Sequence, residues 1–142
     1  MTYDYKQKKI VAVLSSKLET GVALNVIGHL AVSIGAYSDK ELMGRPHLQD
    51  ASGVKHTGIA KYPFVITKAN PTKIRKLIVD ARLKEDVLIA DYPEQMLTTG
   101  HDDELAESLL VVKEEEINYL GVIFYGNSDS VTELTGKLSL WR

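Results

Sequence analysis

The sequence predicts an α/β protein built as a three-layer sandwich, with one mixed sheet of four to five strands and helices on both faces. Two observations support this. Apolar runs of strand length alternate with helical patterns along the 142 residues, as they do in proteins whose helices cover a single sheet. Near-continuous apolar runs such as VLIA and GVIF suit strands that are buried on both sides. The length fits one domain, residues 1–142.

The first strand and helix are predicted at 9–14 and about 21–36, joined by the polar corner KLETG. Ligands often bind at such a corner in α/β proteins. Residues 37–62 show no clear period, and we expect a long functional or capping loop there. Asn70 and Pro71 follow a second strand as the cap and first position of a helix. The elements expected after the loop are strands at 63–69, 86–91, 120–126 and 137–141, and helices from 71, at about 103–112 and at 128–135.

The composition excludes several classes of protein. The chain has no cysteine, so it has no disulfides, thiolate nucleophile or cysteine-bound metal, and we expect a reducing, cytoplasmic location. A net charge of −2 provides no basic field for a nucleic acid, which we therefore do not expect as a partner. No apolar stretch approaches the length that spans a bilayer, so no membrane association is expected. No P-loop, G-x-G-x-x-G or G-x-S-x-G motif is present, and no cofactor is predicted.

The first predicted helix carries two unusual features. Gly28, Ala31 and Gly35 form a stripe of small residues, which predicts close approach by another backbone because glycine otherwise lowers helix propensity. Asn25 and His29 are neighbours at i and i+4. They form either a buried structural pair or, for Asn25, a ligand contact at the strand corner. We favour a structural role for His29, which lies one turn deeper.

A second candidate cluster is TTGHDDE, residues 98–104. His101 could transfer protons near neutral pH with Asp102 beside it, and Thr99 and Gly100 would offer ligand contacts at a helix start. The structural alternative is that Thr99 and Asp102 form a capping box and that the acidic residues only favour the helix dipole.

A third cluster surrounds Asp50, which forms a turn signature with Ser52 and Gly53. His47, Asp50 and His56 match no familiar zinc spacing, so no metal site is predicted.

Two series of motifs resemble known families. The strand, L-E-T-G, the small-residue helix, the strand ending in IFYG and the terminal V-x-x-L-T-G and K-L-S-L resemble the type II peptidyl-tRNA hydrolases, whose fold the chain would share over most of its length. The chain is more similar still to a bacterial group of unknown function, domain-of-unknown-function family two thousand. The matching motifs are Leu24-Asn25, the turn from Asp50 to Gly53, the strand 63–66 and Thr99-Gly100-His101-Asp102.

The departures limit what the hydrolase resemblance implies. Val22 and Leu24 stand where those enzymes have two lysines, and Gly28 stands where they have a glutamine. Of the hydrolase motif residues compared, only an aspartate is kept, at Asp91. Without these cations the corner would not hold a tRNA end, which binds through phosphate contacts, so we expect peptidyl-tRNA hydrolysis to be lost.

Three functions therefore remain open. The first is a small-molecule or hydrolase-like site at the C-terminal edge of the strands, with His101, Asp102 and Asp91 as catalytic residues. Its ligand-binding residues would be Asn25, Asp50, Thr99 and Gly100. The second is a non-catalytic binding or assembly module, for which a homodimer would be unsurprising because the resembled fold often forms one. The third is residual peptidyl-tRNA hydrolysis.

Overall fold

The structure is a computed structural model that describes residues 4–142. A five-stranded mixed sheet forms its centre, with strand order β5-β6-β1-β4-β7. β1 pairs in parallel with β4 and antiparallel with β6. β5 pairs antiparallel with β6, and β7 pairs antiparallel with β4. This confirms the predicted α/β class and the mixed sheet. The sheet strands are β1 (Lys8–Ser15), β4 (Phe64–Ala69), β5 (Val87–Pro93), β6 (Tyr119–Asn127) and β7 (Ser139–Leu140).

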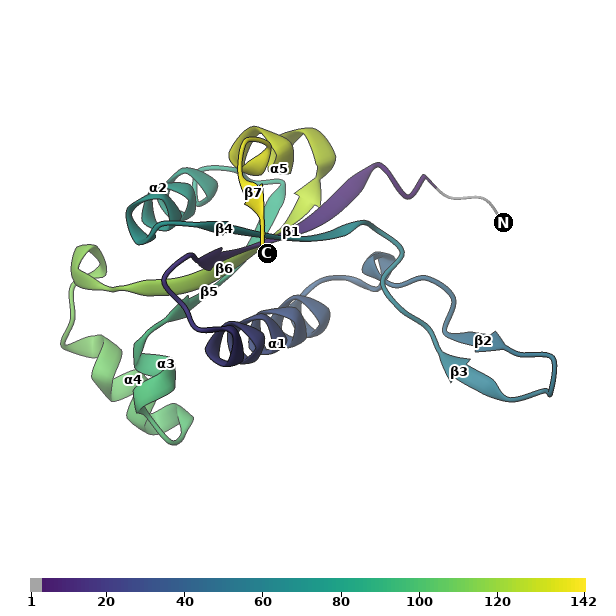
Figure 1. The fold of residues 1–142 in the computed structure, drawn as a ribbon, viewed down its shortest axis with the longest axis horizontal. Coiled ribbons are helices and arrows are strands. Elements are labelled where there is room, and N and C mark those ends of the chain that lie inside the picture. The colour runs from purple at the N-terminus through teal and green to yellow at the C-terminus, as the bar shows by residue number, and fades with distance from the viewer. Residues whose placement is uncertain (1–3) are drawn as a thin grey trace.

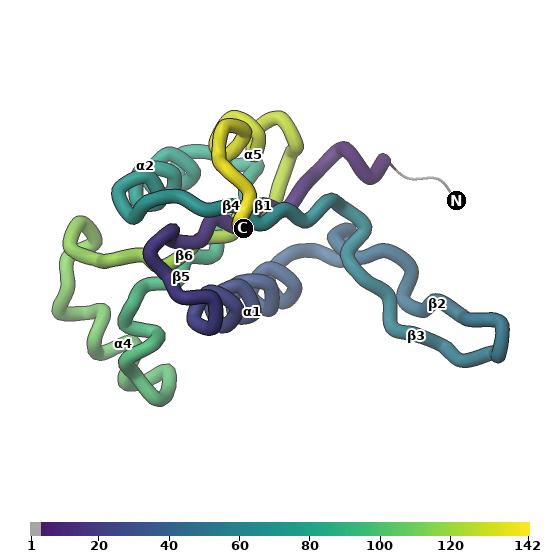
Figure 2. The backbone as a smooth tube through the Cα atoms, in the orientation of Figure 1, coloured from purple at the N-terminus to yellow at the C-terminus, as the bar shows by residue number. Residues whose placement is uncertain are grey.

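Helices cover both faces of the sheet (Figures 1 and 2). The long helix α1 packs on one face, and α2 and α5 pack on the other. β1 shows why both faces are apolar: Ile10, Ala12 and Leu14 point toward α1, whereas Val11 and Val13 point toward α2 and α5. The helices are α1 (Thr20–Tyr37), α2 (Pro71–Ala81), α3 (Gln95–Thr98), α4 (Asp102–Leu110) and α5 (Ser128–Thr135), with 3-10 turns η1 (Lys40–Leu42) and η2 (Glu114–Glu116).

The predicted N-cap and first position are confirmed for α2 (Pro71–Ala81). The Asn70 side chain accepts a hydrogen bond from the backbone N–H of Lys73 at 2.8 Å, and Pro71 occupies the first helical position. The predicted helix at 103–112 is α4. The short helix α3 was not predicted, because its four residues are too few to establish a helical period.

The segment predicted as a loop at 37–62 contains a hairpin instead. β2 (His47–Gln49) and β3 (Lys55–Thr57) pair antiparallel with each other and form a separate two-stranded sheet. Figure 1 shows that this hairpin projects away from the body of the domain. Its strands have three residues each, too few for the alternation that predicts a strand.

Two expectations about α1 are not met by the single chain. A Cβ atom added at Gly28 or Gly35 would meet nothing within 4 Å among the described residues, so no other backbone of this chain approaches the small-residue stripe. The helix is also long and apolar enough, by length and composition alone, to cross a membrane. Core helices of soluble proteins pass the same test, and α1 packs on the sheet through its buried residues Ala23, Val26, Leu30 and Ile34.

Candidate functional site

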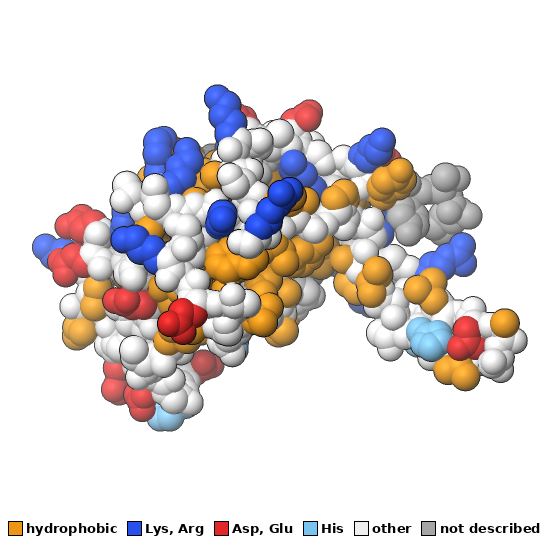
Figure 3. Space-filling model, viewed as in Figure 1, with side chains coloured by type: hydrophobic (Ala, Val, Ile, Leu, Met, Phe, Trp, Pro, Cys, Tyr) orange, Lys and Arg blue, Asp and Glu red, His pale blue; other side chains and the backbone are white. Residues whose placement is uncertain are grey.

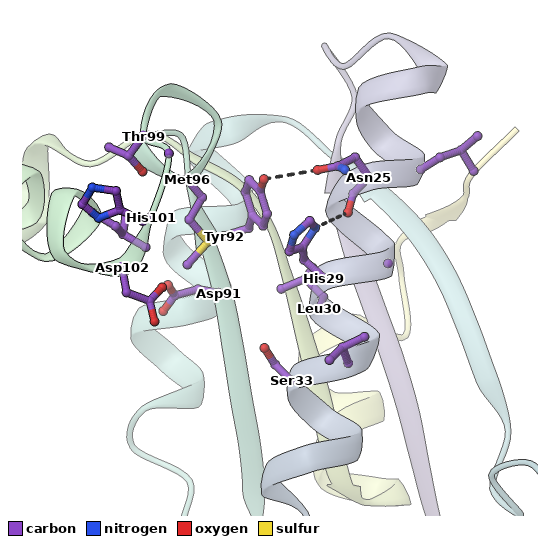
Figure 4. A pocket seen from close by; sticks show the side chains of 15 residues that line it. Asn25, His29, Leu30, Ser33, Asp91, Tyr92, Met96, Thr99, His101 and Asp102 are labelled. Atoms are coloured by element: carbon purple, nitrogen blue, oxygen red, sulfur yellow. Dashed lines mark hydrogen bonds between the residues drawn. The ribbon is translucent and has the colours of Figure 1, made fainter.

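An open pocket of about 830 Å³ lies beside α1, near the C-terminal end of β5. One flank of α1 forms one wall, the α3–α4 segment forms the opposite wall, and the end of β5 lies between them (Figure 4). Apolar side chains supply much of the surface, as is usual in small-molecule sites. These are Leu24, Leu30, Val32, Met96 and Leu105.

The pocket brings together most of the residues that the sequence singled out. Six of the seven predicted site residues line it, although they come from three separate segments of the chain. They are Asn25, Asp91, Thr99, Gly100, His101 and Asp102.

Asp50 is the exception, because it lies in the turn of the projecting hairpin. Its Oδ1 accepts hydrogen bonds from the backbone N–H groups of Ser52 (2.9 Å) and Val54 (3.0 Å). Its Oδ2 lies 2.8 Å from Nε2 of His56. The bond with His56, followed by the backbone bonds, holds the pKa of Asp50 below its usual value. Asp50 therefore stabilises its own turn and does not contribute to the pocket.

His101 is the N-cap of α4. Its Nδ1 accepts a hydrogen bond from the backbone N–H of Glu104 at 3.3 Å. In return, the Glu104 side chain accepts a hydrogen bond from the backbone N–H of Gly100 at 2.9 Å. This reciprocal pattern resembles a capping box, but it involves His101 and Glu104, so the predicted box of Thr99 and Asp102 is wrong. The Thr99 hydroxyl instead donates to the carbonyl of Gln95 at 2.9 Å.

His29 is not the buried structural residue that the sequence favoured. Its side chain is exposed along the pocket wall, and its Nδ1 lies 3.0 Å from the backbone carbonyl of Asn25. A carbonyl oxygen can only accept, so Nδ1 carries the proton of the neutral ring. Nε2 is then a hydrogen-bond acceptor, with no partner among the described residues.

Tyr92 joins His29 and Asn25 in one small group (Figure 4). The rings of His29 and Tyr92 meet edge to face, with centroids 5.9 Å apart. The Tyr92 hydroxyl donates to Oδ1 of Asn25 over a long 3.4 Å, and burial raises the pKa of Tyr92. Because Oδ1 faces Tyr92, the Asn25 amide nitrogen remains as a donor.

Asp91 borders the pocket, but its carboxylate contacts Arg82 at the C-terminal end of α2. Its carboxylate lies 3.8 Å from the guanidinium of Arg82. Burial raises the pKa of Asp91, while the charge of Arg82 opposes this shift and that of Glu114 adds to it. Arg82 also contacts Glu114 (3.5 Å) and the hydroxyl of Tyr119 (3.1 Å). The contact with Arg82 therefore gives Asp91 a structural role.

The charges around the pocket restrict its ligands. Two carboxylates, those of Asp91 and Asp102, line it. Among the described residues no lysine or arginine belongs to the lining, although Arg82 lies 3.8 Å from Asp91. The start of α4 is occupied by its own cap, which weakens its use as an anion site. A neutral ligand fits this lining better than a phosphate or a carboxylate.

Sequence reasoning missed His29 and Tyr92 as pocket residues. The spacing of His29 four residues after Asn25 could have indicated it, because side chains at i and i+4 lie on the same face of a helix. Tyr92 directly follows Asp91 at the end of a predicted strand, and only the pairing of β5 as an edge strand places it against α1.

The sheet and pocket define the class of protein, a mixed α/β domain with an open pocket beside its longest helix. The chain belongs to the DUF2000 family of proteins of unknown function, whose family model matches residues 8–142. The predicted membership of this family is thereby confirmed.

A solved structure shows the same fold. It is that of a protein of unknown function from Agrobacterium tumefaciens strain C58, with a TM-score of 0.84 and 21% sequence identity, covering 96% of this chain and 98% of that one. No curated protein matched the sequence. Neither the family nor this structure bears on the resemblance to type II peptidyl-tRNA hydrolases, which stays a prediction.

Proposed function

We propose that this protein binds a small, uncharged organic molecule in the pocket between α1 and α4. The observation that carries the proposal is the group formed by His29, Asn25 and Tyr92. It presents an acceptor at His29 Nε2 and a donor at the Asn25 amide, next to apolar side chains. A few polar groups that converge on an apolar pocket are typical of small-molecule sites.

The two polar groups suggest the chemistry of the ligand. A hydroxyl or amide N–H can donate to His29 Nε2, and a carbonyl can accept from Asn25. A primary amide attached to an apolar ring satisfies both. An anion would lie near the carboxylates of Asp91 and Asp102. Among residues 4–142, Arg82 offsets the charge of Asp91 at 3.8 Å, but no lysine or arginine pairs with Asp102.

If the pocket is catalytic, hydrolysis of an ester or amide is the reaction to test first. His29 is the residue we place as proton acceptor, because its Nδ1 is anchored on a backbone carbonyl and its Nε2 has no hydrogen-bonding partner among the described residues. In this role it replaces His101, whose Nδ1 caps α4. Residual peptidyl-tRNA hydrolysis is disfavoured, because the described residues of the lining include no lysine or arginine to bind RNA phosphates.

The second candidate function is a non-catalytic binding or assembly module. The capping role of His101 favours it, since the T-G-H-D segment then has a purely structural explanation.

Titration with benzamide and benzoate tests the proposal, because the two probes have similar shapes and differ in charge. We expect the wild-type protein to bind benzamide more tightly than benzoate by isothermal titration calorimetry. Asn25→Ala should weaken benzamide binding, whereas Asn118→Ala, an exposed asparagine outside the pocket, should not. Equal binding of both probes, or benzamide binding that survives Asn25→Ala, would contradict the proposal. Turnover of p-nitrophenyl acetate by the wild type, lost in His29→Leu, would assign the hydrolase-like role.

A further inference from the structure

The outward face of α1 is apolar and uncovered. Only four of its 18 residues are buried, and all four face the sheet. Leu24 and Val32, on the opposite side, have 65% and 72% of their surface exposed. The helix contains no charged residue, which is unusual for a helix face in water.

The uncovered face has a sequence pattern that is symmetric about the middle of the helix. Gly28 lies at its centre, with a large apolar residue four positions away on each side and a glycine seven positions away on each side. At about 100° per residue, these positions fall within about 40° of one direction on the helix. They are Gly21, Leu24, Gly28, Val32 and Gly35.

The three glycines leave this face open to close approach. A Cβ added at any of them would meet nothing within 4 Å among residues 4–142. Glycine at these exposed positions costs helix propensity, and the fold of the single chain gives no reason for it. Close packing against another helix does give a reason.

The projecting hairpin is a second uncovered apolar region of the molecule. Leu48, Val54 and Ile59 expose 46%, 54% and 73% of their surface on or beside it. Within the described range 4–142 its strands pair only with each other, and an isolated two-stranded hairpin is marginally stable in water. In Figure 3 apolar side chains lie both on the body of the domain and on the projecting hairpin.

We propose that two copies of this chain associate through α1, which packs antiparallel against the partner's α1 across a twofold axis at Gly28. In that arrangement Leu24 faces the partner's Val32, and Gly21 faces the partner's Gly35. The hairpin of each copy packs against the other copy. A twofold contact uses the same surface on both subunits, and the symmetric pattern around Gly28 meets this requirement.

The available apolar area fits a second copy. Six large side chains on the two regions expose between 44% and 73% of their surface: Leu24, Val32, Met43, Leu48, Val54 and Ile59. At roughly 100 Å² each they supply on the order of 600 Å² per copy, against the roughly 800 Å² per partner of a stable interface. The glycine stripe adds backbone area. A lipid surface is a poorer occupant, because amphipathic membrane helices carry lysine or arginine and α1 has none.

The arrangement has a consequence for the pocket. Leu24, Gly28 and Val32 belong to both the uncovered face and the pocket wall, so the partner's helix would border the open side of the pocket. The association itself does not depend on whether the pocket has a ligand.

Engineered cysteines test the geometry, because the natural chain has none. Gly28→Cys should form a disulfide-linked dimer on mild oxidation, since the two copies of this position meet at the axis. The double variant Leu24→Cys/Val32→Cys should cross-link, whereas Leu24→Cys alone should not. Leu110→Cys, at an 85% exposed position on α4, is the matched control and should stay monomeric on a denaturing gel. Efficient cross-linking of Leu24→Cys alone would overturn the antiparallel arrangement.

Sedimentation tests the association without cross-links. The wild type should sediment at twice the 15.7 kDa chain mass. Gly28→Leu should sediment as a folded monomer, because the added side chain enters open space in the single chain but blocks the helix pair. Leu110→Glu should remain a dimer. A monomeric wild type, or a Gly28→Leu variant that remains a dimer, would overturn the proposal, and circular dichroism confirms that each variant is folded.

Discussion

The two histidines that border the pocket use their ring nitrogens in different ways. In His101, Nδ1 accepts from the backbone N–H of Glu104 and so completes the cap of α4. In His29, Nδ1 donates to the backbone carbonyl of Asn25, and Nε2, beside the pocket, has no hydrogen-bonding partner among residues 4–142. The motif that contains His101 is therefore explained by helix capping. On the apolar helix α1, His29 has its Nε2 available to a ligand.

Replacing His29 with leucine is the change with the largest expected effect on binding. His29→Leu should weaken benzamide binding at least tenfold, or about 1.4 kcal/mol, because the unoccupied acceptor is removed. The side chain is exposed and its hydrogen bond with the Asn25 carbonyl lies at the surface, so the melting temperature should stay close to that of the wild type. Calorimetry and thermal unfolding measure the two effects. A destabilised variant with unchanged affinity would assign His29 a structural role.

Replacing His101 should have the opposite outcome. His101→Ala should lower the free energy of unfolding by about 1 kcal/mol, the usual cost of losing an N-cap, and leave benzamide affinity unchanged. His101→Asn should restore most of the stability, because asparagine is a good N-cap residue. Urea unfolding of the two variants checks this. If His101→Asn remained stable but lost benzamide binding, the assignment of the two histidines would have to be exchanged.

A smaller effect is expected for the tyrosine that contacts His29. Tyr92→Phe keeps the ring that meets His29 edge to face and removes only a long hydrogen bond to Asn25. Benzamide affinity should fall by about two- to threefold, in line with a bond worth less than about 1 kcal/mol. A loss as large as that of His29→Leu would show that the Tyr92 hydroxyl contacts the ligand directly.

The smallest effect on ligand binding is expected from a pair of tyrosines outside the pocket, Tyr62 and Tyr125. Burial raises the pKa of Tyr62 and of Tyr125 to about 12. A raised pKa means that the folded state favours the neutral phenol, so this stability is complete below about pH 10 and is lost as the pH rises toward 12.

Thermal unfolding between pH 9 and 12 measures this loss. Tyr125→Phe should reduce it at no cost at neutral pH, because the buried Tyr125 hydroxyl has no hydrogen-bonding partner in the part of the chain that the structure describes. Tyr62→Phe should lower the melting temperature, since the Tyr62 hydroxyl donates to Glu41 at 2.8 Å. Alkaline unfolding that stays unchanged in both variants would contradict these roles.

Local patterns in the sequence predicted the fold well. The alternation of apolar runs with helical periods, and caps such as Asn70, depend on residues close in the chain, and the structure confirms both. The hairpin at 47–57 was missed because its short strands carry no period. The close approach predicted at the small-residue stripe of α1 does not occur among residues 4–142, because such a stripe predicts close packing but does not identify the partner.

The site could be predicted only in part. Asn25, Asp91 and the segment 99–102 were expected near one edge of the sheet, and they line one pocket. The orientation of a ring cannot be read from its position in the chain, so the roles of His29 and His101 required the backbone geometry around each. The place of Asp50 likewise depended on a hairpin whose direction the sequence does not specify.

Nuclear magnetic resonance of protein labelled with ¹⁵N-histidine tests the central claim most directly. Long-range proton–nitrogen correlations should show His29 protonated at Nδ1 and His101 protonated at Nε2. Adding benzamide, but not benzoate, should shift the Nε2 resonance of His29 and leave that of His101 in place. A His29 ring protonated at Nε2, or a benzamide response at His101 in place of His29, would contradict the claim that His29 is the ligand-binding histidine of this pocket.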